Sequence, residues 1–129
     1  MSKGILIETS LKFSAKIIKL QQYLIKQKQE TIISKQIIRS ATSIGANINE
    51  ANYGSSKQDF IAKMHIALKE CAETEYWIRL LKEAEYIDNA YSISLLTDCL
   101  SIKRMLISSI NTIKSNMSDK IWFISDYMI

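Results

Sequence analysis

The stretch RSATSIGANINEANYG, Arg39 to Gly54, decides the fold of this chain. Its apolar residues, together with one that precedes it, recur every three or four positions: Ile37, Ala41, Ile44, Ile48 and Ala51. This spacing lines them up along one side of an α-helix and predicts that this side is buried. The opposite side carries Arg39, Ser43, Ala46 and Glu50, and its small residues allow another helix to come close. A helix with two packing sides is typical of an assembly.

The composition favours a single domain made of long helices. The chain has 129 residues, which is enough for one domain with one core. It contains no proline and only three glycines, Gly4, Gly45 and Gly54. Residues that break helices and form turns are therefore too scarce for a β-sandwich or a β-barrel.

Apolar periodicity divides the chain into four helices, predicted at about residues 5–29, 32–52, 56–86 and 90–117. Short links make consecutive helices antiparallel neighbours. The predicted fold class is therefore all-α, an up-and-down antiparallel four-helix bundle over residues 1–117. An aromatic C-terminal tail follows at 118–129, and Trp122, Phe123 and Tyr127 in it show no helical period. The tail can dock on its own bundle or on a neighbour.

Several residues mark the expected ends of the second and third helices. Thr31 is predicted to cap the second helix, and Gly54 is predicted to end it. Ser55 or Ser56 then begins the third helix. Gly45 lies in the middle of the second helix, where it costs about 1 kcal/mol relative to alanine. We expect the close approach of another helix to compensate for this cost.

The first predicted helix is amphipathic and basic. Two apolar rows are predicted to form one wide buried face, and they comprise Phe13, Ile17, Leu20 and Leu24, and Ile7, Leu11, Ile18 and Ile25. The reverse side carries four lysines, Lys12, Lys16, Lys19 and Lys26. Residues 1–40 hold eight basic side chains against two acidic ones. Such a region is either a solvated surface or an attractor of nucleic acid or anionic lipid.

The third predicted helix carries two apolar rows. The main row comprises Phe60, Ile61, Met64, Leu68, Cys71 and Ile78, and the second comprises Ala62, Ile66, Trp77 and Leu80, with Glu73 inside it. The core of one bundle can cover only one apolar row of this helix, so the second row is predicted to contact another subunit. The alternative is one broad core face. The predicted oligomer interface consists of Ser43, Ala46, Glu50, Ile66, Glu73, Trp77 and Leu80.

Glu75 lies within the main row of the third helix. Folding the third and fourth helices together places Glu75 near the level of Cys99 and about one turn from Lys103. We predict that Glu75 is paired, because an unpartnered buried carboxylate costs several kcal/mol or stays protonated. Cys71 and Cys99 lie on core-facing rows, where they can be neighbours, and both are expected to be reduced.

Residues that could support catalysis are few. His65 is the only histidine, and the sequence has no phosphate-binding glycine loop. Glu73 and Glu75 are two positions apart on a helix and point in different directions. We therefore predict no enzyme activity, no metal and no cofactor. No signal peptide is recognised, and no apolar run reaches the ~18 residues needed to cross a bilayer, so we expect a cytoplasmic protein without a membrane partner.

Two stretches resemble a known family. The run from Arg39 to Gly54 and the run SKQDFIAKMHIALKECAETEYWIRLLKEAEYI from Ser56 resemble four-helix-bundle proteins encoded within intervening sequences of 23S ribosomal RNA genes. The most diagnostic parts are SIGANINE at 43–50 and ALKECAETEYWIRLL at 67–81. The resemblance implies ring-shaped homopentamers. The family is also similar to the accessory protein of diversity-generating retroelements, a basic pentamer that binds nucleic acid and a reverse transcriptase.

Two functional hypotheses follow. The first is a non-enzymatic homo-oligomer, expected to be a pentamer, that binds RNA or DNA through phosphate contacts without reading bases. The residues expected to bind are Lys12, Lys16, Lys19 and Lys26, with Lys35 and Arg39 as weaker candidates. The second is a protein-interaction scaffold with no nucleic-acid role, in which Trp77, Leu80 and the tail aromatics matter more than the lysines.

Overall fold

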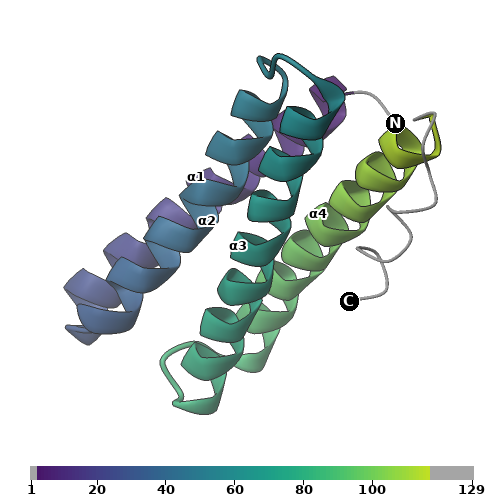
Figure 1. Ribbon diagram of the computed structural model, residues 1–129. Coiled ribbons are helices and arrows are strands. Elements are labelled where there is room, and N and C mark those ends of the chain that lie inside the picture. Colours follow the sequence, from purple (N-terminus) through teal and green to yellow (C-terminus); the bar gives the residue numbers. More distant parts are fainter. Residues whose placement is uncertain (1–2, 117–129) are drawn as a thin grey trace.

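The computed structural model describes residues 3–116 and contains four helices. They are α1 (Lys3–Lys28), α2 (Ile32–Ala51), α3 (Lys57–Glu83) and α4 (Asn89–Ser115). The helices run up and down, with the α1–α2 and α3–α4 turns at one end and the α2–α3 loop at the other (Figure 1). The predicted all-α up-and-down four-helix bundle is confirmed.

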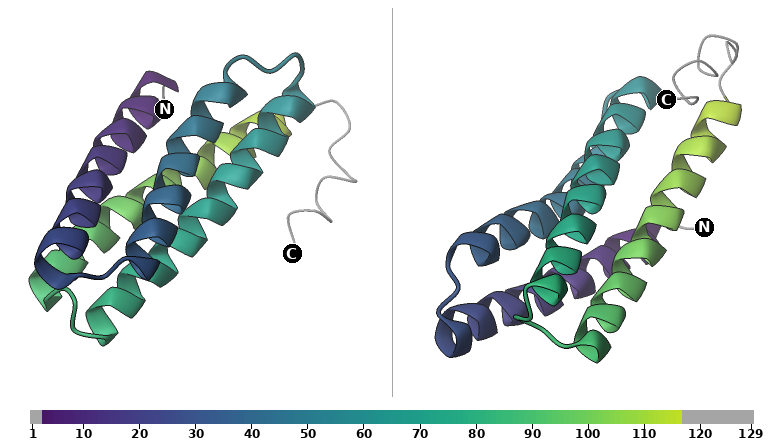
Figure 2. Two further views of the ribbon diagram at one scale, coloured as in Figure 1. Left: turned by 90° about the vertical axis from the view of Figure 1, so that its left-hand side faces the viewer. Right: turned by 90° about the horizontal axis from the view of Figure 1, so that it is seen from below.

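Each helix packs against the helix before it and the helix after it, and α4 returns beside α1. The bundle therefore has four outer sides, which we name α1/α2, α2/α3, α3/α4 and α1/α4 after the helices that border them. The two further views in Figure 2 show how the four helices are arranged around the core. The α1 and α4 helices pack less closely than the other neighbouring pairs.

The core is built from the apolar row predicted for α2 and from the first of the two rows predicted for α1. The α2 row is buried throughout, and so is the first α1 row of Phe13, Ile17, Leu20 and Leu24. Aliphatic side chains of α3 and α4 complete the core, among them Ile78, Leu81, Leu95, Ile102 and Leu106. Burying each such side chain fully stabilises the fold by about 1.5–3 kcal/mol. These rows hold the four helices together.

Gly45 allows α1 and α2 to come close, as the sequence predicts. A Cβ atom added at Gly45 would lie 3.3 Å from Oγ of Ser10 on α1. One turn away, Oγ of Ser14 donates a hydrogen bond of 3.4 Å to the backbone carbonyl of Ala41. The close partner of Gly45 is therefore a helix of the same chain.

A pair of buried hydroxyls joins α2 to α3. The Oγ atom of Ser40 lies 2.8 Å from Oγ1 of Thr74, and neither side chain reaches solvent. Oγ1 of Thr74 also donates to the backbone carbonyl of Glu70 at 2.8 Å. Both polar groups thus have partners inside the bundle, as buried polar groups require.

The second apolar row of α1 is not buried, so the prediction of one wide buried face is wrong. Leu11, Ile18 and Ile25 are 64%, 43% and 42% exposed, and Ile7 is half-buried. The physical reason is that α2 meets α1 through Ser10 and its neighbours and leaves the more distant row uncovered. The α1/α2 side therefore presents an apolar strip with a spacing of seven residues.

The cap of α2 comes from Glu30, and the prediction of Thr31 is wrong. The side chain of Thr31 makes no capping hydrogen bond. The buried Glu30 carboxylate instead accepts from the backbone N–H groups of Ile32, Ile33 and Ser34, at 3.1, 2.9 and 2.7 Å. A left-handed backbone conformation at Gln29, with φ of 55°, turns the chain so that Glu30 reaches these donors.

The other helix ends agree only in part with the sequence. Ser56 caps α3, as predicted, and accepts from the N–H of Asp59 at 3.1 Å. The α2 helix ends at Ala51, three residues before the predicted stop at Gly54. The α3 helix ends at Glu83 and not at residue 86, because a left-handed residue follows at 85. The predicted aromatic tail, 118–129, lies outside the described residues, and its separation from the bundle stays a prediction.

The Glu30 cap can be tested against its neighbour Thr31. We expect Glu30→Ala to lower the free energy of unfolding by about 1–3 kcal/mol, because three backbone N–H groups at the start of α2 lose a charged acceptor. Thr31→Ala should change it by less than about 0.5 kcal/mol, since that side chain caps nothing. Urea unfolding followed by circular dichroism measures both. Equal losses in the two variants would contradict the assignment.

Candidate functional site

The lysines of α1 form an exposed row along the α1/α4 side. Lys12, Lys19 and Lys26 are exposed, and they recur seven residues apart along α1. No ion pair of residues 3–116 involves any of the three. Tyr23 lies on the same side of the helix and is 37% exposed. The row is therefore a positively charged strip in contact with water.

Lys16 belongs to the same row but contacts α4. Its Nζ atom forms an ion pair with Asp98 and donates to Oγ of Ser94 at 3.1 Å. Because the side chain is 39% exposed, this pair contributes little to stability. Its main consequence is geometric, since it fixes the lysine row next to α4.

One serine of α4, Ser94, contacts the lysine row, and the sequence pattern does not single it out. Ser94, Ser101 and Ser108 recur seven residues apart, which keeps them on one side of the helix. The contact between Lys16 and Ser94 places that side next to α1. Ser94 and Ser108 are exposed, and Ser101 is half-buried. The spacing of seven is the available signal, but hydrophobic periodicity does not detect it because serine is polar.

The predicted interface residues come together on the α2/α3 side. Ala46 and Glu50 are exposed on α2, and Ser43 is half-buried there. On α3, Ile66 is exposed, and Glu73, Trp77 and Leu80 are half-buried. Nζ of Lys63 lies 3.2 Å from a carboxylate oxygen of Glu50 and bridges the two helices. The structure therefore supplies a mixed surface of small, apolar and charged residues.

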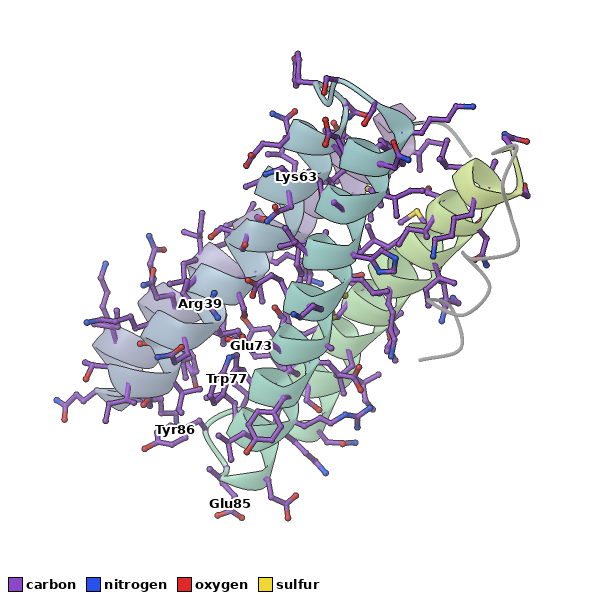
Figure 3. All side chains as sticks on the ribbon, in the orientation of Figure 1. Arg39, Lys63, Glu73, Trp77, Glu85 and Tyr86 are labelled. Carbon is purple, nitrogen blue, oxygen red and sulfur yellow. The ribbon has the colours of Figure 1, made fainter. Side chains whose placement is uncertain are left out.

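A charged cluster occupies the middle of the α2/α3 side, where Arg39, Glu73 and Trp77 lie between the two helices (Figure 3). Arg39 forms ion pairs with Glu73 and, at 3.3 Å, with Glu70. The ring N–H of Trp77 donates to Glu73 at 3.0 Å. This hydrogen bond is the main cause that lowers the pKa of Glu73, and Arg39 acts in the same direction. The bond to Glu73 in turn raises the pKa of Arg39.

Lys35 and Arg39, the two weaker nucleic-acid candidates, differ in their surroundings. Lys35 is exposed on α2, next to the α1–α2 turn. The guanidinium group of Arg39 is held by two carboxylates of α3. Most of the Arg39 charge is thus balanced within the chain, whereas the charge of Lys35 faces solvent.

Glu75 is paired, as predicted. Its side chain is 21% exposed, and its carboxylate lies 2.9 Å from Nη2 of Arg79 and 3.9 Å from Nζ of Lys103. The sulfur atoms of Cys71 and Cys99 lie one turn away and 3.6 Å apart, so the two thiols are neighbours across α3 and α4. Both cysteines are buried and free.

By their side chains and hydropathy, residues 3–116 contain neither a metal site nor a membrane-spanning helix. Within this range, no group of three or more histidine, cysteine, aspartate and glutamate side chains is arranged to hold a metal ion. None of the helices in the described part of the chain is long and apolar enough to span a bilayer.

The order and packing of the helices define an all-α protein of the up-and-down four-helix-bundle class. Residues 3–108 match the 23S rRNA-intervening sequence protein family, and the chain belongs to this family. The resemblance found in α2 and α3 is thereby confirmed and extended to α1 and most of α4.

One solved structure shares both the fold and much of the sequence. It is the crystal structure of a protein with unknown function from the S23 ribosomal protein family of Bacteroides thetaiotaomicron. The two chains are 45% identical, with a TM-score of 0.85, and the match covers 86% of this chain and 99% of the other. No curated protein sequence matches the chain significantly.

The Glu73 cluster predicts an acid-sensitive contribution to stability. The lowered pKa means that ionised Glu73 favours the folded state above the pKa of an unfolded glutamate, about 4.3. This contribution is lost as the pH falls through the folded-state pKa. Glu73→Gln should therefore lower stability at pH 7 and approach the wild type near pH 3.

Urea unfolding at the two pH values measures this difference. Glu83→Gln is the matched control, because Glu83 is exposed near the end of the same helix. It should change stability little at either pH. A Glu73→Gln deficit of the same size at both pH values would contradict the role given to the Glu73 carboxylate.

Proposed function

We propose that the chain is a non-enzymatic cytoplasmic bundle that assembles with copies of itself and binds RNA or DNA through the α1/α4 side. The observation that carries the proposal is the exposed row of Lys12, Lys19 and Lys26. Lysines without a partner on the surface are available to phosphates, whereas Lys16 and Arg39 already contact carboxylates.

The dimensions of the row suit a polyanion. Lys12 and Lys26 are 14 residues apart, which is about 21 Å along a helix. The α1 row supplies charge, and Ser94 of α4 beside it supplies a hydroxyl group that can donate to a phosphate oxygen. Lysine and serine side chains that contact phosphates do not contact the edges of the bases. The binding mode we propose is therefore independent of sequence and driven by counterion release.

Self-association is proposed through the seven residues of the α2/α3 side. A second copy would cover the exposed Ile66 and the half-buried Trp77, while Ser43 and Ala46 would allow its backbone to approach. Family resemblance favours a ring of five copies. A ring would repeat the lysine row around its axis, so that a long polyanion could contact several rows at once and bind more tightly than to one.

A protein-interaction scaffold is the second candidate function. The observation that favours it is apolar exposure outside the proposed interface. Leu11, Ile18 and Ile25 form an exposed strip on the α1/α2 side. On the α3/α4 side, Ile93 and Ile107 are 54% and 38% exposed. Such strips are typical of helices that dock on a partner helix.

Removing the lysine row should weaken nucleic-acid binding. For the variant K12Q/K19Q/K26Q we expect at least about a tenfold loss of affinity at ~50 mM salt. The slope of log affinity against log salt should fall by about 2 to 3, because three phosphate contacts are lost. Fluorescence anisotropy with a labelled single-stranded RNA of about 30 nucleotides measures both quantities.

The variant K57Q/K69Q/K82Q is the matched control, since it removes the same charge from exposed lysines of α3. It should keep most of the affinity and of the salt slope. If the two triple variants bind equally, the α1 row is not the binding surface. Binding by the wild type that ignores salt would contradict the phosphate-contact mode, and no binding by the wild type would favour the scaffold.

The assembly surface is tested by placing a charge on the α2/α3 side. Ala46→Arg should weaken self-association by about a hundredfold, because a buried unpaired charge costs about 3 kcal/mol. Ala72→Arg is the matched control, an exposed alanine on α3 outside the proposed surface. Sedimentation velocity over a range of concentrations gives the assembly state. A monomeric wild type, or disruption by Ala72→Arg alone, would refute this surface.

A further inference from the structure

Cys71 and Cys99 are the two most reactive side chains inside the bundle, and they touch. Their sulfur atoms are 3.6 Å apart, and each side chain is 1% exposed. The Cys71 sulfur lies 3.3 Å from the backbone carbonyl of Cys99, and the Cys99 sulfur lies 3.5 Å from that of Cys71. Each thiol therefore reaches the backbone of the opposite helix, so α3 and α4 are already close at this level.

A charged pair forms the next layer of the same helix pair. Glu75 follows Cys71 by four residues on α3, and Lys103 follows Cys99 by four residues on α4. The two charged groups are 3.9 Å apart. The positive charge of Lys103 favours the thiolate form of Cys71, and the negative charge of Glu75 opposes it.

We propose that Cys71 and Cys99 are a redox modification site, at which a small peroxide converts the two thiols into a reversible disulfide that joins α3 to α4. A disulfide needs its sulfur atoms about 2.05 Å apart. Side-chain rotations must therefore bring the two sulfur atoms about 1.5 Å closer together to form the bond.

The chemistry assigns a different role to each thiol. The hydrogen bond from the Cys99 thiol is the largest influence on the pKa of Cys71 and lowers it; Lys103 acts in the same direction, whereas burial and Glu75 act against it. The proton correspondingly stays on Cys99, whose pKa is raised by the same bond and by burial. Cys71 is therefore the nucleophile, and Cys99 is the resolving thiol.

The reaction balances with one peroxide. The Cys71 thiolate attacks one oxygen of hydrogen peroxide, the O–O bond breaks, and the released hydroxide takes a proton to give water. Cys71 is then a sulfenic acid. The Cys99 sulfur attacks the Cys71 sulfur, loses its proton, and expels the hydroxyl group as a second water. Two thiols are oxidised by two electrons, and the peroxide is reduced by two electrons.

The oxidant reaches this site during local opening of the bundle, because both sulfurs are shielded from solvent. Oxidation is thus slower than at an exposed thiol. The product ties α3 to α4 near the middle of the helix pair, far from the turn that already connects them. Such a bond restricts the unfolded chain and favours the folded bundle.

The test treats the full chain with hydrogen peroxide in native buffer. We expect the intact mass to fall by about 2 Da, and iodoacetamide added after denaturation should label no cysteine instead of two. The melting temperature should rise by about 5–10 °C, and dithiothreitol should restore the original value. In Cys99→Ser, Cys71 has no resolving thiol, so dimedone should add to its sulfenic acid.

The double variant S92C/C99S is the matched control. It moves the thiol of α4 from position 99 to position 92 and leaves a serine at position 99. Both positions are buried, and they are seven residues, or about 10 Å, apart along the helix. It keeps two buried thiols but separates them, so both should remain free under the same treatment. Two free thiols in the oxidised wild type, or oxidation of Cys71 to a sulfinic acid without a disulfide, would overturn the proposal. So would disulfide formation in the control at the wild-type rate.

Discussion

The packing of α2 against α1 and α3 at the same time is the constraint on which the structure depends. On one flank, Gly45 lets Ser10 of α1 come within contact distance of the α2 backbone. On the other flank, Ser40 meets Thr74 of α3 inside the protein. Small residues on both flanks bring the two neighbours close, and the aliphatic row between them is then fully buried. The outer sides of the bundle follow from this arrangement.

The position of the basic strip is one result of this constraint. Because α2 covers the Ser10 edge of α1, the lysine row must lie on the flank that borders α4. There α1 and α4 pack least closely, and the α4 residues that contact the row are Ser94 and Asp98. The carboxylates of α3 lie instead on the α2/α3 and α3/α4 sides, where they form ion pairs with Arg39, Arg79 and Lys103. Charge is thus separated between sides of one small domain.

Much of this arrangement could be predicted from the sequence, because helical periodicity reports directly on which side of a helix is apolar. The α2 row, the Gly45 contact, the pairing of Glu75 and the proximity of Cys71 and Cys99 all follow from the spacing of three and four and from short links. These features depend on few neighbours. A helix of known direction and an antiparallel partner are sufficient to place them.

The remaining features depend on contacts that periodicity does not encode. Leu11 and Ile18 look like core residues because the sequence gives the width of an apolar arc but not how much of it a neighbour covers. Thr31 is a better cap by residue type than Glu30, and only the left-handed turn at Gln29 reverses their roles. Lys16 looks like the other lysines of the row in the sequence, because its partner Asp98 lies on a helix that is distant in sequence.

The contact between Ser40 and Thr74 also limits how the helices can slide. Moving α3 along α2 by one turn, about 5.4 Å, would pull these two hydroxyls apart and set Ser40 beside aliphatic carbon or a carboxylate. The Cys71 and Cys99 layer and the adjacent Glu75 and Lys103 layer oppose the same sliding of α4 along α3. Aliphatic rows alone would tolerate such a shift, because a translation by one turn places another aliphatic side chain where the first one packed. These few polar contacts between helices therefore select a single register for the packing of α3 against α2 and of α4 against α3.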